Sequence, residues 1–82
     1  MINYGGPVSV YRQVAAELRR GIESGQYPPG TRLPSINDLV QTYGIARLTA
    51  NKALRLLVAE GLAELSEGMG FYVKGPDSSG GE

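Results

Sequence analysis

The sequence predicts an α+β fold, mainly α-helical, in which three helices precede a small β-hairpin: a winged helix-turn-helix. Two observations predict it. Residues 33–61 (LPSINDLVQTYGIARLTANKALRLLVAEG) read as a short helix, a tight turn at Gly44 and a longer helix closed by Gly61. Two helices that meet at a steep angle have this layout. Residues 62–74 then alternate apolar and polar side chains around a glycine-containing loop, as a hairpin does.

The first helix is expected from about Val8 to Ser24. Apolar side chains recur there at the spacing of one helical face: Tyr11, Val14, Ala15, Leu18 and Ile22. Gly25 follows, and glycine is favoured in the left-handed residue that ends many helices. A Gly-Gly-Pro run at residues 5–7 interrupts regular structure before this helix. Residues 1–7 are therefore expected to form a flexible arm.

A rigid Pro-Pro-Gly turn at residues 28–30 and a short extended segment at residues 31–33 lead into the second helix. Ser35 is its expected N-cap. Asp38, three residues later, approximates a capping box, although that motif prefers Glu or Gln. Further along, Leu39, Val40 and Tyr43 are expected to be buried, Gly44 to end the helix and Ile45 to fill the core beyond it.

The third helix is expected from about Arg47 to Glu60. Four apolar residues at helical spacing should face inward: Ala50, Ala53, Leu54 and Leu57. Ala46 occupies the N-cap, where Ser or Thr is favoured, and this choice should cost about 1 kcal/mol of helix stability.

Two strands, from Leu62 to Ser66 and from Phe71 to Lys74, are expected to pair across a loop at residues 67–70. The register stays open, because Leu62, Tyr72 and either Leu65 or Val73 compete for the inward face. The folded domain should therefore extend over residues 8–74. Residues 75–82 (GPDSSGGE) have the composition of a flexible tail and are predicted to be disordered.

Composition narrows the class of protein further. The 82 residues are enough for one small domain. There is no Cys and no His, so a disulfide framework, most zinc sites and the usual general base are missing, and no cofactor is expected. The chain shows neither a signal peptide nor an apolar run long enough for a membrane span. These features fit a cytoplasmic protein.

The distribution of charge matters more than the net charge, which is zero. Between Gly44 and Ala59 the charged residues are Arg47, Lys52 and Arg55, with no acid among them. The first helix adds Arg12, Arg19 and Arg20. This pattern indicates a basic face on a neutral body, or simply a solvated helix surface.

The ordered combination PPGTRLPS, LxxxYGIxR, KALRLLxxEGL and GxGxxV resembles the N-terminal DNA-binding domain of GntR-family bacterial transcription regulators over about residues 8–74. The resemblance implies a winged helix-turn-helix that binds operator DNA, usually as a dimer on a near-palindromic site. Arg47 matches the Arg at the start of the family's recognition helix, Thr49 a hydroxyl that contacts the DNA backbone, and Ser35 the N-cap of the second helix, whose amide end can face a phosphate.

Departures from the family pattern concern the DNA-facing positions. Asn37 replaces an Arg that contacts DNA in many members, and Asn51 replaces a common Arg. Ala46 replaces Ser or Thr, and Leu48 a small polar residue. The wing reads Leu65-Ser66-Glu67 where basic residues are usual, and Met69 and Phe71 replace a frequent polar or basic residue and a Thr. Each lost cation removes a phosphate contact. One copy should therefore bind DNA more weakly and with more salt sensitivity than is usual for the family, or bind in a mode that relies on the third helix. Family members continue into an effector and dimerisation domain, which is not expected in this chain.

The expected DNA-binding residues are Ser35, Arg47, Leu48, Thr49, Asn51, Lys52, Arg55, Gly68, Met69 and Gly70. An Arg in the first turn can pair with guanine, Asn with adenine, and Leu with a thymine methyl, while Lys52 and Arg55 should meet phosphate. Each also has a plainer interpretation: Thr49 can bond within its own helical turn, Asn51 can be an ordinary surface residue, and Leu48 can contact a protein. Met69 and Phe71 either wedge into a minor groove or pack against the domain.

The sequence thus predicts a protein, not an enzyme, that binds double-stranded DNA and regulates transcription as a repressor. Self-association into a weak homodimer stays open. The alternative is a winged-helix module that binds proteins and little DNA, which the neutral charge, the acidic wing and the apolar residues Leu48, Leu56 and Met69 favour.

Overall fold

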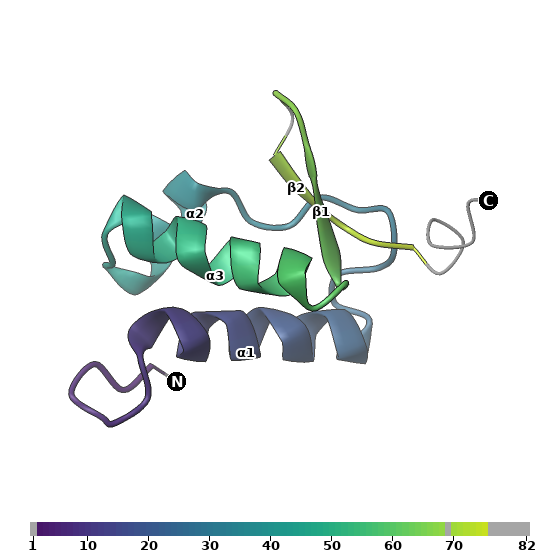
Figure 1. The fold of residues 1–82 in the computed structure, drawn as a ribbon. Helices are drawn as coiled ribbons and strands as arrows, with labels where there is room; N and C mark the ends of the chain where they lie inside the picture. The colour runs from purple at the N-terminus through teal and green to yellow at the C-terminus, as the bar shows by residue number, and fades with distance from the viewer. Residues whose placement is uncertain (1, 69, 76–82) are drawn as a thin grey trace.

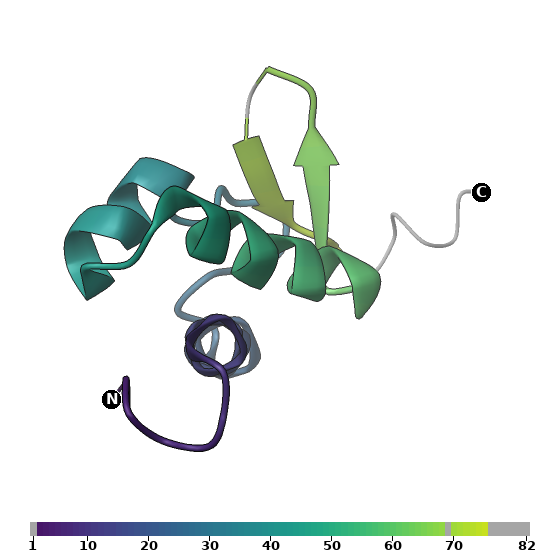
Figure 2. The same cartoon turned by 60° about the vertical axis from the view of Figure 1, so that its left-hand side comes forward.

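The computed structural model describes residues 2–68 and 70–75 (Figure 1). Within them the chain forms α1 (Val10–Ser24), α2 (Ile36–Tyr43), α3 (Arg47–Ala59), β1 (Ala63–Ser66) and β2 (Gly70–Val73). The helix α3 runs through the middle of the fold. One side of it packs on α1, and the β1–β2 hairpin rises from the opposite side, as Figure 2 shows with α1 viewed end-on. The α+β winged helix-turn-helix expected from the sequence is confirmed.

The two helices of the turn begin and end close to their predicted positions. The capping box at the start of α2 is present, because the Ser35 hydroxyl accepts the Asp38 N–H at 3.0 Å and the Asp38 carboxylate accepts the Ser35 N–H at 3.0 Å. Gly44 ends α2 in the left-handed conformation, at φ 65°, which costs a glycine little. The helix α3 ends at Ala59, one residue earlier than expected.

The first helix begins at Val10, two residues later than expected. The Ser9 carbonyl accepts the N–H groups of Arg12 and Gln13, so the helical hydrogen bonds start there. The Val8 carbonyl is instead bonded by the side-chain amide of Gln13 at 2.8 Å. Val8 therefore belongs to the segment that precedes the helix.

Residues 2–7, which the sequence predicts to form a flexible arm, make hydrogen bonds with α1 and α2. The Gln13 amide donates to the Asn3 carbonyl at 2.8 Å and accepts the Asn3 N–H at 2.6 Å. The Tyr4 hydroxyl donates to the Tyr43 carbonyl at the end of α2. A single glutamine and a tyrosine, neither of which follows a periodic pattern, thus fold the arm back onto the helices.

The start of α3 gives a first prediction. Ala46 has the extended backbone of an N-cap (φ −70°, ψ 153°) but no side chain that accepts a hydrogen bond from the first turn. We expect Ala46→Ser to raise the free energy of unfolding by about 1 kcal/mol, because a hydroxyl there would accept a free N–H of that turn. Urea unfolding checks this, with Ser35→Ala as the mirror control that should lose a similar amount. An unchanged midpoint for Ala46→Ser would show that the geometry does not admit a cap.

The hydrophobic core lies where α1, α3 and the inner face of the hairpin meet. All four residues of α3 predicted to face inward are buried, and the Ile45 prediction is confirmed as well. The whole buried set is Val14, Ala15, Leu18, Leu33, Leu39, Ile45, Ala50, Ala53, Leu54, Leu57, Ala63, Phe71 and Val73.

The hairpin resolves the register that the sequence left open. Ala63 pairs with Val73 and Leu65 with Phe71, so these four share the inner face. Leu65 nevertheless is 49% exposed, since it lies toward the hairpin loop, beyond the core. β1 begins one residue later than predicted, at Ala63, and ends at Ser66 as predicted, whereas β2 lies one residue earlier than predicted, at Gly70–Val73.

Candidate nucleic-acid interface

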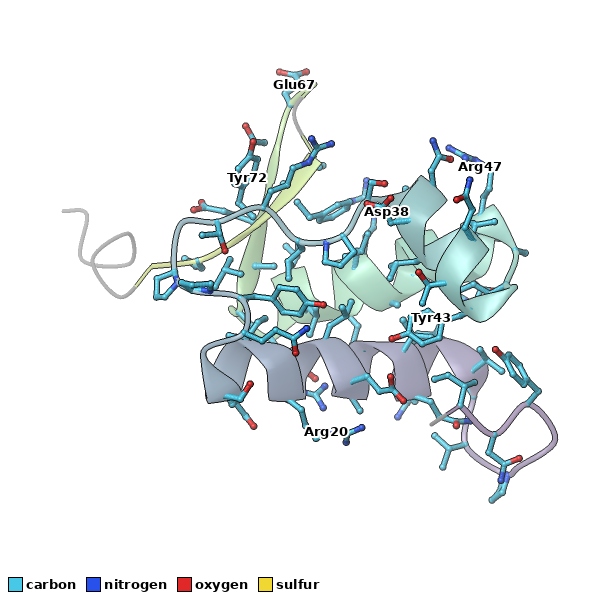
Figure 3. The ribbon with its side chains drawn as sticks, turned by 180° about the vertical axis from the view of Figure 1, so that it is seen from behind. Arg20, Asp38, Tyr43, Arg47, Glu67 and Tyr72 are labelled. Carbon is cyan, nitrogen blue, oxygen red and sulfur yellow. The ribbon has the colours of Figure 1, made fainter. Side chains whose placement is uncertain are left out.

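The exposed side of α3 carries the residues expected to read DNA. Arg47, Asn51 and Arg55 are spaced by four residues and form one stripe along the helix. Leu48 lies beside this stripe and is 71% exposed. In Figure 3 Arg47, Asp38 and the hairpin residue Glu67 lie toward one end of the molecule, whereas Arg20 of α1 lies at the other. The start of α3 and the loop of the hairpin therefore project to the same side.

Arg47 is held by Asn37, which the sequence marked only as a position lacking a cation. Its Nη1 donates to the side-chain oxygen of Asn37, in the first turn of α2. Arg47 itself is exposed, and a guanidinium has further N–H donors for a base or a phosphate. Asn37 thus fixes the direction of the arginine without occupying all of its donors.

Lys52 points toward α1 and not along the stripe. Its ammonium lies 5.0 Å from the centre of the Tyr11 ring, and the Arg12 guanidinium lies 5.8 Å from the same ring. The pKa of Tyr11 is lowered, chiefly by the hydrogen bond from Arg12 to its hydroxyl and by the charge of Arg12, with a smaller effect of Lys52. Lys52 is exposed at the rim between α1 and α3, where a phosphate contact stays a prediction.

The basic residues of α1 do not form one continuous face with α3. Arg19 forms a bidentate ion pair with Glu60, with N–O distances of 2.8 and 3.0 Å. This pair links α1 to the end of α3. Arg20 lies far from Arg47 (Figure 3). Of the three cations that the sequence suggested for this face, Arg12 is the one placed near Lys52, through Tyr11.

The residues predicted to form the wing differ in their exposure to solvent. Gly68 is exposed in the loop, and Gly70 begins β2 with φ 102°. Met69 lies outside the described residues. Phe71 is 6% exposed, so it packs against the domain and does not wedge into a groove. Leu56, which the sequence offered as a surface for protein partners, packs against the core instead.

Tyr43 connects α2 to α1. Its hydroxyl donates to Glu17 at 3.0 Å. Burial, followed by the hydrogen bond and the charge of Glu17, raises the pKa of Tyr43 to about 12, so the phenol is neutral at physiological pH. The pKa of the Asp38 carboxyl shifts in the opposite direction. It is lowered first by the hydrogen bond from the Ser35 backbone amide and then by the Ser35 hydroxyl.

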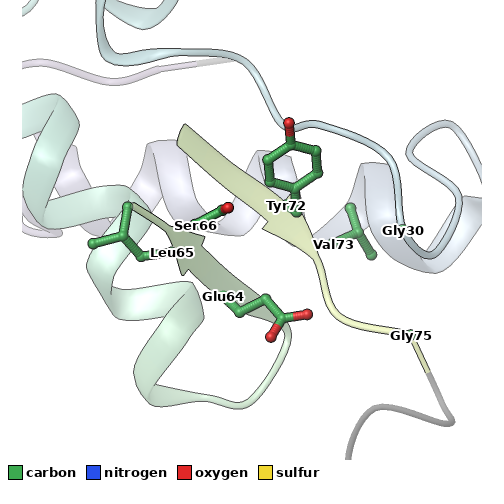
Figure 4. Close-up of a pocket in the computed structure, with 7 residues that line it drawn as sticks. All are labelled: Gly30, Glu64, Leu65, Ser66, Tyr72, Val73 and Gly75. Atoms are coloured by element: carbon green, nitrogen blue, oxygen red, sulfur yellow. The ribbon is translucent and has the colours of Figure 1, made fainter. Parts of the chain in front are cut away.

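An open hollow lies against the hairpin (Figure 4). Glu64, Ser66 and Tyr72 supply its polar side chains, and none of its described lining residues is basic. Two other acidic residues have structural partners, because Asp38 caps α2 and Glu60 binds Arg19. No group of three or more potential metal ligands occurs in residues 2–68 and 70–75. No described helix is long and apolar enough to cross a membrane.

Two residues that sequence reasoning did not select stand near the expected interface. One is Asn37, through its bond to Arg47. The other is Arg32, whose guanidinium lies against Gly70 of the hairpin. The extended segment at residues 31–33 indicates in the sequence that these residues could pair with a strand. The sequence does not indicate that the partner is β2.

Three helices, two exposed arginines on the third and a hairpin that projects to the same side as the start of that helix define a winged helix-turn-helix DNA-binding domain. The family comparison agrees, since residues 10–73 match the family described as bacterial regulatory proteins, gntR family. The chain belongs to this family.

Similar proteins of known name support the same assignment. The chain is 39% identical over 71 residues to the histidine utilization repressor of Pseudomonas putida, covering 87% of this chain and 29% of that protein. It superimposes on YtrA from Sulfolobus acidocaldarius, a GntR-family transcription factor, with a TM-score of 0.83 and 33% identity, covering 92% of this chain and 64% of that one. For the AraR DNA-binding domain in complex with operator ORX1, the TM-score is 0.78 and the identity 33%, covering 89% and 94%. The chain spans less than a third of the length of the curated relatives it matches first.

Proposed function

We propose that this chain binds double-stranded operator DNA by placing α3 in the major groove and the hairpin over the neighbouring minor groove or its phosphates. The observation that carries the proposal is the stripe of Arg47, Asn51 and Arg55 along α3. Its first residue, Arg47, lies toward the side of the molecule where the hairpin residue Glu67 also lies (Figure 3). The segment from Arg47 to Ala59 contains no acidic residue, so a phosphate backbone meets no repulsion along this helix.

Each candidate residue receives a role from its position. Arg47 pairs with a guanine, Asn51 with an adenine, and exposed Leu48 contacts a thymine methyl. Arg55 and Lys52, further along α3, bind phosphates. The remaining candidates hold the backbone: the Thr49 hydroxyl, the amides at the Ser35 end of α2, and the glycines Gly68 and Gly70, which allow close approach.

We further propose that the outcome of binding is repression, in the cytoplasm. Support comes from relatives such as the histidine utilization repressor, which is a repressor by name. Two copies of the domain on a near-palindromic site would double the number of phosphate contacts and offset the weakness of one copy. Self-association on DNA is thus part of the proposal.

The test is an NMR titration of the labelled protein with a mixed-sequence duplex, first at low and then at physiological salt. We expect shifts of the amides of Ser35, of residues 47–55 and of Gly68 and Gly70, and we expect them to fade as salt rises. Silence at low salt would overturn DNA binding. It would favour a protein-interaction module, for which exposed Leu48 would be the first residue to mutate.

The charge at the hairpin gives a second prediction. Glu67 lies at the exposed loop (Figure 3), so Glu67→Lys should bind any duplex about tenfold more tightly at low salt and steepen the salt dependence by roughly one phosphate contact. Fluorescence anisotropy at several salt concentrations measures both quantities. Glu23→Lys in the last turn of α1 is the matched control, with the same change of net charge. Equal behaviour of the two variants would mean that the hairpin does not approach DNA.

A further inference from the structure

We propose that Arg32, which lies outside the helix-turn-helix and the hairpin, supplies the cation of the wing and contacts the phosphodiester backbone of DNA there. This inference rests on the proposed function, since it concerns the same bound duplex. It adds a residue from the α1–α2 connection to an interface otherwise made by α3, the start of α2 and the hairpin loop.

Backbone pairing places Arg32 beside β2. The Leu33 N–H donates to the Phe71 carbonyl at 2.8 Å, and the Val73 N–H donates to the Thr31 carbonyl at 2.8 Å. Arg32 thereby forms an isolated antiparallel bridge with Tyr72, so residues 31–33 run alongside β2 without adding a strand to the two-stranded sheet. Leu33 is 2% exposed and faces the core. Because side chains alternate along a strand, the Arg32 side chain leaves from the opposite, outer face.

Gly70 brings the guanidinium toward the loop of the hairpin. A Cβ atom at Gly70 would lie 3.2 Å from Nε and 3.3 Å from Nη2 of Arg32, closer than ordinary packing allows. The guanidinium therefore occupies space that a larger side chain at position 70 would fill. Gly70 is the first residue of β2, close in sequence to the turn residues Glu67 and Gly68, so the positive charge of Arg32 lies near that turn.

The positive charge of Arg32 also acts on Asp38, in the first turn of α2. The pKa of Asp38 is lowered first by the backbone amide of Ser35, then by its hydroxyl, and also by the charge of Arg32. Arg32 lines the same hollow as Ser35 and Asp38. It thus stands between the hairpin and the beginning of α2, two of the elements that the proposed complex brings to the DNA backbone.

The donors of Arg32 have no partner among the described residues. Arg19 is bound to Glu60 and Arg47 to Asn37, whereas Arg32 makes no ion pair or side-chain hydrogen bond with residues 2–68 or 70–75. An exposed guanidinium with unused donors matches the geometry of a phosphate group. The loop itself contributes Glu67 and no described cation, so Arg32 offsets a negative charge that would otherwise face the duplex.

The test compares Arg32→Ala with Arg20→Ala, which removes the same charge on the far side of the molecule (Figure 3). Binding to two duplexes of unrelated sequence is followed by fluorescence anisotropy from low to physiological salt. We expect Arg32→Ala to weaken binding to both duplexes by about threefold to tenfold and to reduce the salt slope by about one. Arg20→Ala should match the wild type, and Arg32→Lys should keep the slope.

Three results would overturn the inference. Equal affinities of Arg32→Ala and Arg20→Ala, with the wild type binding both duplexes, would reject Arg32 while leaving the proposed function intact. A loss confined to one duplex would reject the backbone contact in favour of base reading. A wild type that binds neither duplex at low salt would reject the proposed function together with this inference.

A second measurement does not depend on a variant that folds. The side-chain Nε–H signal of Arg32 in the labelled wild-type protein should shift on addition of either duplex, and the Arg20 signal should not. A stationary Arg32 signal in the presence of shifts along α3 would also reject the contact.

Discussion

Leu54→Ala is expected to lower the free energy of unfolding by about 2–5 kcal/mol, the range typical of a leucine removed from a packed core. Leu54 is fully buried in α3, the helix that packs on α1, on α2 and on β1. The cavity would therefore lie among the elements that have to stay together for the domain to exist. The total free energy of unfolding of a native protein is about 5–15 kcal/mol, so this single substitution should remove a large share of it.

Urea unfolding followed by circular dichroism measures the loss. The matched control is Leu48→Ala in the same helix, because Leu48 is 71% exposed and should change the free energy of unfolding by no more than about 0.5 kcal/mol. If Leu54→Ala cost less than about 1 kcal/mol, the neighbouring side chains would have closed the cavity, and the packing described for α3 would be wrong.

The fold was largely predictable from the sequence because its helices are periodic. The buried positions of α3 follow the helical spacing, and the α2 boundaries follow from Ser35, Asp38 and Gly44, whose local chemistry does not depend on distant residues. The hairpin was predictable to within one residue. Its register was not, because Leu62, Tyr72 and either Leu65 or Val73 compete for the inward face. Only the pairing in the structure shows that Leu65 and Val73 share that face while Tyr72 pairs with Glu64 on the other.

The candidate interface was less predictable, because its details are contacts between segments far apart in sequence. The residue types on α3 were readable, but the bond from Arg47 to Asn37 and the position of Lys52 over Tyr11 require the packing of α3 on α2 and α1. Arg32 and Gly70 were each visible as single residues. Nothing in the sequence shows that one makes room for the other.

The zero net charge, which counted against DNA binding in the sequence, has a structural explanation. Several acidic side chains interact with other parts of the domain. Glu60 pairs with Arg19, Asp38 caps α2, and Glu17 accepts a hydrogen bond from the hydroxyl of Tyr43. The cations Arg47 and Arg55 remain exposed along α3. Since a phosphate backbone responds to the local field and not to the sum over the protein, a neutral domain can still present a binding face.

Arg47→Ala is expected to weaken binding to the operator by about 1–3 kcal/mol and to relax the preference at one base pair. A guanidinium in the first turn of the recognition helix can bond the O6 and N7 atoms of guanine together, and alanine has no donor to replace it. Selection of bound sequences from a random duplex library, followed by affinity measurements on single-base variants of the selected site, gives both quantities.

Two controls separate base reading from charge alone. Arg47→Lys keeps the charge but loses the planar pair of donors, so it should retain most of the affinity for unrelated duplexes and still lose the base preference. Asn37→Ala removes the acceptor that holds Arg47, so its loss should be smaller and should disappear in the Arg47→Ala background, as expected for two residues that act together. If Arg47→Ala left both affinity and base preference unchanged, the reading of DNA would have to be assigned to Asn51 and Arg55, further along the same stripe.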